Sequence, residues 1–311
     1  LKMSRKEFNF QGDLFSEGPL ERPLPQYQGP RELTVGEMFS GPGGIGLALN
    51  QTKRGKLSFK HLWATDYDSD TCETYRKNIF TGIHKEALSI CKDIREVDIA
   101  KELPQADGFL YGFPCNDFSN VGESKGLEGH FGPLFSYGVE YININNPLFF
   151  FAENVSGLRS ANEGNAFKTI LKALNNAGKF GYNVTAHLYK FEQYGIPQAR
   201  HRFILIGIRG DLVSPKNGEK LFFKVPKAPG IVTPVKEALK DIPDWASNQE
   251  RTNQSKVVIE RLKFIRPGEN VWQAEDRMPE HLRLKVKGAR LSQIYRRLDP
   301  DKPRSEERRV G

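Results

Sequence analysis

The sequence predicts an α/β protein in which a mostly parallel sheet is followed by a second, smaller and less regular domain. Three observations predict it. From Glu32 to Arg209, short apolar segments alternate with helical ones, which is typical of parallel strands joined by helices. A glycine-rich stretch follows the first apolar segment. After Arg209 the alternation stops, and Pro, Lys and Arg become frequent at irregular spacing.

The elements can be placed along the first region from apolar runs and helix signals. Strands are expected at 32–39, 59–66, 148–155, 182–191 and 202–209, with further apolar segments at 89–94 and 108–114. A glycine loop that opens a helix is expected at 40–51, and helices are expected at 68–80, 135–146 and 162–178. The second helix has Asp68 or Ser69 near its cap, and the last is amphipathic and ends at Gly178.

Composition bounds the class of protein. Of 311 residues, 38% are hydrophobic and 11% aromatic, enough to form a real core. Three cysteines are too few for a disulfide framework, so a reduced, cytoplasmic setting is expected. The N-terminus lacks an apolar signal region, and the longest apolar run, PLFFFA, is too short to span a bilayer. No membrane partner is therefore expected.

The positive charge is concentrated near the C-terminus. The net charge is +8, and residues 251–311 hold 16 basic and 9 acidic side chains. A nucleic-acid partner and an ordinary solvated basic surface both fit this pattern. Residues 1–32, rich in proline, are expected to form an extended arm.

FSGPGG, at 39–44, follows the first strand and opens a helix. Glycines allow close backbone approach to a ligand, and a helix N-terminus favours an anionic group, although a tight turn without a ligand fits equally. Asp66 ends the second strand, where a carboxylate can bind a ribose, and Asp93 could reach an adenine amino group. The motif FSGPGG differs from the GxGxxG motif of dinucleotide-binding proteins. This difference favours an adenosine-containing ligand other than a dinucleotide.

Three further segments carry reactive or charged groups. Cys115, in GFPCNDFS, follows a proline and is either a nucleophile or a buried structural cysteine. Glu153 ends an apolar strand, where a carboxyl group needs a partner and can act as a proton donor; a cap or a buried ion pair is the alternative. Arg200 and Arg202 are expected to face one side, suiting a phosphate or a planar base, although an exposed strand start fits too.

FSGPGG, WATD, KDI, GFPCNDFSxxG, ENV and QARHR occur in this order, and together they resemble the DNA (cytosine-5)-methyltransferase family, in its bacterial or phage type II modification form. The resemblance implies a Rossmann-like S-adenosylmethionine-dependent methyltransferase fold. It also implies four parts. They are an N-terminal arm at 1–32, a catalytic domain at 33–209, a partial target-recognition domain at 210–303 and a non-native tail at 304–311.

The resemblance implies S-adenosylmethionine as the methyl donor, bound by three groups of residues. Its methionine and ribose would be lined by Phe39, Ser40, Gly41, Gly43 and Gly44. Its ribose hydroxyls and adenine would be held by Asp66, Tyr67, Asp93 and Ile94. The pocket beside its methyl group would be completed by Gly112, Phe113 and Pro114.

The resemblance also implies a covalent mechanism without a metal. The Cys115 thiolate would attack C6 of a flipped-out cytosine, while Glu153 acts at N3 and Asn154 braces the loop. Arg202 and Arg200 would hold the cytosine O2 and the Cys115 loop. The substrate loops would include Ser119 and Gln198.

Several expectations concern partners and extent. The implied partners are double-stranded DNA with a short specific site and a cognate restriction endonuclease encoded nearby, with the chain acting as a monomer in the cytoplasm of a bacterial or phage-infected cell. The family's two final motifs are missing, and RSEERRVG has no counterpart in the family, so we expect a C-terminally truncated chain.

Other functions stay open. A tRNA cytosine-5 methyltransferase or a non-catalytic nucleic-acid-binding module would share much of this pattern. A nicotinamide-dependent dehydrogenase is disfavoured, because GxGxxG is missing and a Pro-Cys loop is present.

Overall fold

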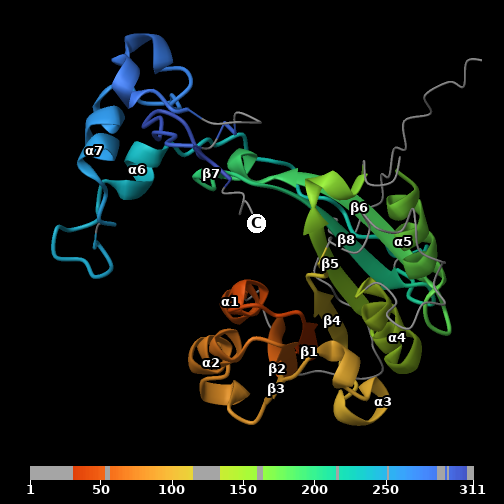
Figure 1. Ribbon diagram of the computed structural model, residues 1–311. Coiled ribbons are helices and arrows are strands. Elements are labelled where there is room, and N and C mark those ends of the chain that lie inside the picture. The colour runs from red at the N-terminus through yellow and green to blue at the C-terminus, as the bar shows by residue number, and fades with distance from the viewer. Residues whose placement is uncertain are drawn as a thin grey trace, which may run out of the picture. The chain divides into compact units, whose positions relative to one another are not determined.

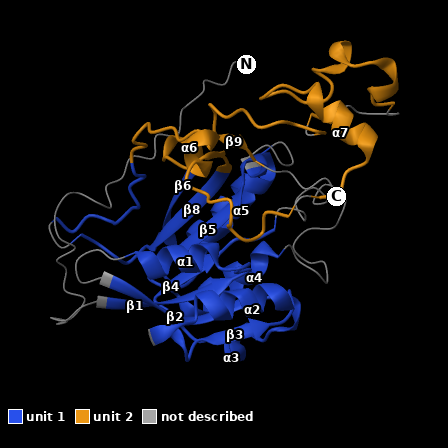
Figure 2. Ribbon diagram, turned by 90° about the vertical axis from the view of Figure 1, so that its left-hand side faces the viewer, with its two compact units in different colours: residues 1–189, 202–226 blue, residues 190–201, 227–311 orange. Residues whose placement is uncertain are grey.

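The computed structural model describes residues 31–52, 57–114, 134–159, 164–214, 217–250, 252–285, 291–292 and 294–306. Most of the predicted N-terminal arm, Cys115 and Ser119 lie outside the described residues. The chain divides into two compact units, which Figure 2 colours separately: unit 1 comprises residues up to 189 and 202–226, and unit 2 comprises 190–201 and residues from 227 onward. The two units are defined by which residues pack together. The domain limits predicted from the sequence, at residues 32, 209 and 303, stay a prediction.

Unit 1 is built on a seven-stranded sheet in the order β3-β2-β1-β4-β5-β8-β6. β1 pairs in parallel with β2 and β4, β2 with β3, and β4 with β5, whereas β8 runs antiparallel to β5. The strands are β1 (Arg31–Met38), β2 (Leu57–Asp66), β3 (Leu88–Cys91), β4 (Gly108–Tyr111), β5 (Phe149–Val155), β6 (Tyr182–Lys190) and β8 (His201–Arg209). The mostly parallel α/β fold predicted from the sequence is confirmed.

The helices of unit 1 connect these strands. They are α1 (Gly44–Gln51), α2 (Ser69–Asn78), α3 (Ile99–Glu102), α4 (Phe135–Asn145) and α5 (Asn165–Asn176). Single 3₁₀ turns are η1 (Gly82–His84), η2 (Ile94–Glu96) and η4 (Ser156–Arg159). Asp68 caps α2, since its side chain accepts a hydrogen bond from the Thr71 amide. The four predicted helices are therefore confirmed, and α3 is an addition.

Helices cover both faces of the sheet. Figure 1 shows α1 and α2 on one face and α4 and α5 on the other. Because successive side chains of a strand point to opposite faces, neighbouring residues of β2 enter different cores. Trp63 belongs to the main core with α4 and α5, and Ala64 belongs to a smaller one with Tyr75 and Ile79 of the α2 segment. Both residues are almost fully buried.

The order of the strands creates a reversal at β1. The chain moves outward from β1 to β2 and β3, and then returns to β4 on the other side of β1. Parallel strands end at the same edge, so the loops after β1, β2, β4 and β5 converge there. Ligands of open α/β sheets bind at such a switch point. This edge therefore places the segments around residues 39–43, 66–68, 112–114 and 153–155 together.

Unit 2 has fewer regular elements, in line with the irregular spacing of its sequence. Its helices are α6 (Val235–Leu239) and α7 (Lys256–Lys263), with 3₁₀ turns η6 (Phe191–Gln193), η7 (Glu275–Arg277) and η8 (Glu280–Leu282). β7 (Gln198–Ala199) and β9 (Arg304–Ser305) form a two-stranded parallel ladder. A small core gathers Ile265, Val271, Ala274, Met278 and Leu282.

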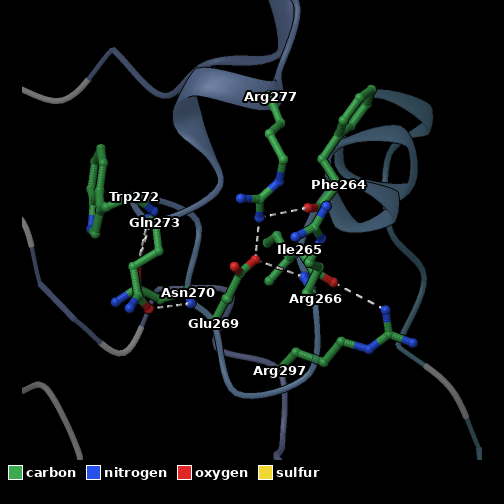
Figure 3. A network of polar contacts seen from close by, with 9 residues as sticks. All are labelled: Phe264, Ile265, Arg266, Glu269, Asn270, Trp272, Gln273, Arg277 and Arg297. Atoms are coloured by element: carbon green, nitrogen blue, oxygen red, sulfur yellow. Dashed lines mark hydrogen bonds and ion pairs between the residues drawn. The ribbon is translucent and has the colours of Figure 1, made fainter.

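Polar contacts to loop backbone hold this small core together (Figure 3). Arg277 pairs with Glu269, and Arg297 donates to the Ile265 carbonyl at 3.0 Å. The Asn270 side chain accepts the amides of Trp272 and Gln273 at 3.0 and 3.1 Å. These bonds satisfy backbone groups of turn and irregular segments that have no helix or sheet partner.

One position shows how tightly the sheet packs. A Cβ added to Gly36 of β1 would lie 2.1 Å from Trp63 Cε2, inside the contact distance. We expect Gly36→Ala to lower the free energy of unfolding by about 1–3 kcal/mol through overpacking. Gly157→Ala is the control, because no atom of the described residues beyond its chain neighbours lies within 4 Å of its added Cβ. Chemical denaturation of both variants measures the difference, and equal stability of the two would contradict this account.

Candidate active site

The segment after β1 is a tight turn with an unusual backbone. Phe39, Gly41 and Gly43 have φ values of 56°, 55° and 102°. Glycine adopts this left-handed region readily, whereas a residue such as Phe39 is strained there by roughly 1–3 kcal/mol. Strain of this kind gathers at functional sites. The Asp66 carboxylate anchors the turn, accepting the Gly41 amide at 2.9 Å.

The same turn has features that suit an adenosine ligand. Among the described residues other than its two chain neighbours, no heavy atom lies within 4 Å of a Cβ added to Gly41, so this side of the turn is open toward them. Asp66 also accepts the Asp68 amide, at 3.2 Å, which leaves each carboxylate oxygen a further lone pair for a ribose hydroxyl. The Tyr67 side chain is 78% exposed next to it, available for stacking. The residues present therefore fit the group that the sequence implies.

Asp93 and Ile94 follow β3 and differ in what they can offer. The Asp93 carboxylate binds Arg95 through its side chain and its backbone amide, and the Arg95 side chain lowers the pKa of Asp93 to about 2. Asp93 is therefore ionised and a strong acceptor for an amino group. Ile94 is 4% exposed and packs in the main core, so its backbone, and not its side chain, could meet the adenine edge.

A buried amide joins the ends of β4 and β5. Asn154 Nδ2 donates to the Phe113 carbonyl at 2.9 Å, and Asn154 Oδ1 accepts the Val155 amide at 2.8 Å. Asn154 is 1% exposed, and Phe113 is buried too. The contact fixes the backbone two residues before Cys115, whose own position lies outside the described residues. A Cβ added to Gly112 would lie 3.7 Å from Glu153 Oε2, so these two strand ends face each other closely.

Glu153 has a charged partner on the next strand. Arg202 Nε lies 2.8 Å from Glu153 Oε1, and the two side chains are 9% and 27% exposed, for the arginine and the glutamate respectively. The antiparallel register opposes Val155 to Arg202 and brings the arginine alongside the carboxylate. Because the pair is largely buried, water and ions screen the attraction between the two charges only weakly. The carboxylate of Glu153 is still partly accessible to solvent.

Arg200 and Gln198 belong to unit 2. Arg200 Nη1 contacts Glu306 Oε1 at 3.1 Å, and Gln198 pairs with Arg304 in the ladder of β7 and β9. The two arginines that flank His201 thus bind different carboxylates. Arg304 and Ser305, which fall in the predicted non-native tail, take part in this ladder; the prediction of a non-native tail is not tested by that contact.

The family model for C-5 cytosine-specific DNA methylases matches residues 33–305, most of the chain. The chain belongs to this family. As a member it is a DNA cytosine-5 methyltransferase that uses S-adenosylmethionine. No helix of the described residues is long and apolar enough to cross a membrane.

Relatives agree with the family, and a solved structure agrees with the fold. The type II methyltransferase M.BbvI of Brevibacillus brevis is 48% identical over 279 residues, covering 86% of this chain and 72% of the relative. The type II methyltransferase M.NgoFVII of Neisseria gonorrhoeae is 32% identical, with 86% and 67% covered. A crystal structure of a DNA modification methyltransferase encoded within an Escherichia coli prophage superposes with a TM-score of 0.55 at 20% identity, covering 88% and 81%. That likeness supports the fold.

In this methylase a buried polar cluster lies close to the β1 turn, and sequence reasoning missed it. Glu37, His61 and Tyr75 are each 1% exposed, and Tyr75 Oη donates to Glu37 Oε2 at 2.6 Å. A signal was present, since Glu37 interrupts the apolar run ELTVGEMF and His61 interrupts FKHLWATD. Burial raises the pKa of Glu37 to about 8 and lowers that of His61 to about 4.

The Asn154 contact gives the first prediction for the site. Asn154→Ala leaves the buried Phe113 carbonyl without its donor, so we expect the free energy of unfolding to fall by about 1–3 kcal/mol, and methyl transfer to slow. Asn176→Ala is the control, because its side chain also donates to a backbone carbonyl, Lys172, but at the surface. Denaturation and methyl-transfer assays test the pair. Asn154→Ala matching Asn176→Ala in both assays would contradict the bracing role.

Glu37 gives a prediction on pH. Between pH 6.5 and 8 the folded state holds the Glu37 proton and the unfolded state has lost it, so stability falls as pH rises, by up to about 1.4 kcal/mol per pH unit. His61 acts in the opposite direction, but between about pH 4 and 6.5, which leaves the upper window to Glu37. Glu37→Gln is expected to remove this slope.

The control for Glu37 is Glu73→Gln on α2, whose carboxylate is exposed and pairs with Lys77. Its stability profile between pH 6.5 and 8 is expected to match that of the unaltered protein. Unfolding at several pH values measures all three proteins. A Glu37→Gln profile as steep as the unaltered one would assign the slope to other groups.

Proposed function

We propose that this methylase transfers the methyl group to C5 of a flipped-out cytosine through a covalent bond between Cys115 and C6. The observation that carries the proposal is the Glu153–Arg202 pair at 2.8 Å, beside strand ends that Asn154 holds together. A nucleophile placed just after residue 113 would share this edge with a carboxyl group and a guanidinium. A base inside a duplex is inaccessible to such a site, so the cytosine must leave the stack.

The proposed chemistry assigns one task to each side chain. The Cys115 thiolate adds to C6, and the electron pair moves into the ring, where Glu153 hydrogen-bonds or protonates N3. When bound, S-adenosylmethionine supplies an electrophilic methyl group, which C5 accepts. Any proton that Glu153 gave to N3 returns to Glu153 as C5 accepts the methyl group. A base then removes the C5 proton, the C5–C6 double bond re-forms, and the thiolate of Cys115 leaves.

Arg202 and Asn154 prepare this arrangement without changing bonds. Arg202 orients the Glu153 carboxylate, and its guanidinium is proposed to donate a hydrogen bond to the cytosine O2. Asn154 fixes the backbone that leads to Cys115. Arg200, Ser119 and Gln198 are proposed as contacts of the substrate and its loops.

The proposed binding residues for S-adenosylmethionine lie at the same edge of the sheet. The turn after β1, with its open side at Gly41, would take the methionine and ribose, together with Phe39, Ser40, Gly43 and Gly44. Asp66 and Tyr67 would hold the ribose and stack on the adenine, while Asp93 and the Ile94 backbone would meet the adenine edge. Gly112, Phe113 and Pro114 would complete the pocket.

The relatives support a proposal for the wider biological role. Type II methyltransferases match this chain over most of its length, which supports a short specific duplex site and a role beside a cognate restriction endonuclease. A monomer in the cytoplasm of a bacterial or phage-infected cell, with no membrane partner, is part of the same proposal.

A mechanism-based trap tests the proposed function. A duplex carrying 5-fluorocytosine at candidate sites, incubated with the chain and S-adenosylmethionine, is expected to yield a covalent adduct on Cys115, because fluorine blocks the final proton loss. Mass spectrometry of the digested protein locates the adduct. Glu153→Gln is expected to form it about 10²–10⁴-fold more slowly, the range of general acid–base catalysis.

Two cysteine variants make the trap specific. Cys115→Ser is expected to abolish the adduct, while Cys91→Ser, which removes an exposed thiol, is expected to keep it. An adduct that still forms in Cys115→Ser would show that Cys115 is not the nucleophile. Adduct formation on single-stranded RNA and not on duplex DNA would redirect the substrate to RNA.

A further inference from the structure

The buried cluster around Tyr75 lies directly beneath the turn proposed to bind S-adenosylmethionine. Glu37 comes from β1, His61 from β2 and Tyr75 from α2. Tyr75 Oη donates to Glu37 Oε2 at 2.6 Å and lies 3.4 Å from His61 Nδ1. The backbone amide of His61 in turn lies 3.3 Å from His84 Nδ1, so four elements meet in one polar network.

Tyr75 supports the first turn of α1 by direct contact. A Cβ added to Gly46 would lie 2.6 Å from Tyr75 Oη. A Cβ added to Gly43 would lie 3.1 Å from Tyr75 Cδ2 and 2.7 Å from Ile79 Cγ1. Only glycine leaves room here, and the helix backbone therefore rests on the tyrosine ring. A shift of the ring would move the start of α1, together with the turn that precedes it.

The network is costly, and the proposed chemistry does not use it. A buried carboxyl group with one hydrogen bond is less favourable than a packed apolar side chain of similar size. Glu37 Oε1 has no partner within the described part of the chain. Polar networks in a core impose one geometry, because an alternative arrangement leaves more groups unpaired. That property suits a support for a binding turn.

We propose that Tyr75, held in place by Glu37 and His61, is a positioning residue for S-adenosylmethionine. It fixes the start of α1 so that the Gly41 amide reaches Asp66 and the open side of the turn keeps its shape. The inference rests on the proposed assignment of this turn to the methyl donor. Tyr75 does not touch that ligand; it acts through Gly43 and Gly46.

Binding of S-adenosylmethionine measured by calorimetry tests the proposal. Tyr75→Phe keeps the ring but removes the hydroxyl, and it is expected to raise the Kd about tenfold, because the turn is no longer pre-organised. KM for S-adenosylmethionine is expected to rise by a similar factor, with kcat unchanged at saturation. Glu37→Gln retains an acceptor for the tyrosine and is expected to stay within about threefold of the unaltered Kd.

A matched control separates positioning from stability. Tyr141 on α4 is as buried as Tyr75, and its hydroxyl donates to the Pro104 carbonyl at 2.8 Å on the other face of the sheet. Tyr141→Phe is expected to lose stability without a change in Kd. Amide exchange in the ligand-free protein gives a second readout: the Gly41 and Gly43 amides are expected to exchange faster in Tyr75→Phe and not in Tyr141→Phe.

The outcomes separate this inference from the proposed site. Asp66→Ala is expected to raise the Kd strongly if the turn binds the methyl donor at all, so an unchanged Kd there would overturn the site assignment. If Asp66→Ala weakens binding but Tyr75→Phe does not, or if Tyr141→Phe weakens it equally, the positioning role of Tyr75 is wrong and the site stands.

Discussion

The parallel pairing of β1 with both β2 and β4 is the constraint on which the site depends. It makes β1 the strand where the chain reverses direction across the sheet, so that four strand ends converge at one edge. The turn at Phe39, the carboxylate of Asp66 and the segment that leads to Cys115 are distant in sequence. They share one edge only because these strands run the same way. Helices on both faces bury the sheet and keep that register.

Two carboxyl groups in this protein show how differently burial can be handled. Glu153 lies beside Arg202, so its charge is balanced and part of it stays accessible. Glu37 has no cation among its contacts in the described residues, and its burial raises the pKa and favours the protonated form, although the hydrogen bond that Tyr75 donates acts in the opposite direction. A partly accessible ion pair, as at Glu153, suits a side chain that is proposed to contact a substrate. A neutral and buried carboxyl group, as at Glu37, suits a side chain that fixes the position of its neighbours.

The fold could be predicted from the sequence to a large extent, because its strands and helices are strongly patterned. The apolar run LFFFAENV predicted the strand β5, and the amphipathic stretch before Gly178 predicted the helix α5. The ordered motifs indicated the family. The contacts that make the site could not be read in the same way. Arg202 meets Glu153 through an antiparallel register between β5 and β8, and nothing in the periodicity of either strand specifies that register. The cluster at Glu37 was missed for a similar reason, since its enclosure depends on Tyr75 from a separate helix.

The ladder between β7 and β9 has a consequence for the order in which the chain folds. Every strand of the seven-stranded sheet ends by Arg209, whereas Gln198 finds its partner at Arg304, and Arg200 finds Glu306. A ribosome releases the residues of the sheet well before those of β9. The segment 190–201 is thus a loop between β6 and β8 whose partners, at residues 304–306, are synthesised after all the strands of the sheet. Such long-range closure is slow, because the entropy of bringing distant segments together opposes it. The sheet can therefore form before this ladder, and the contact between Arg200 and Glu306 is completed only after residue 306 has been released.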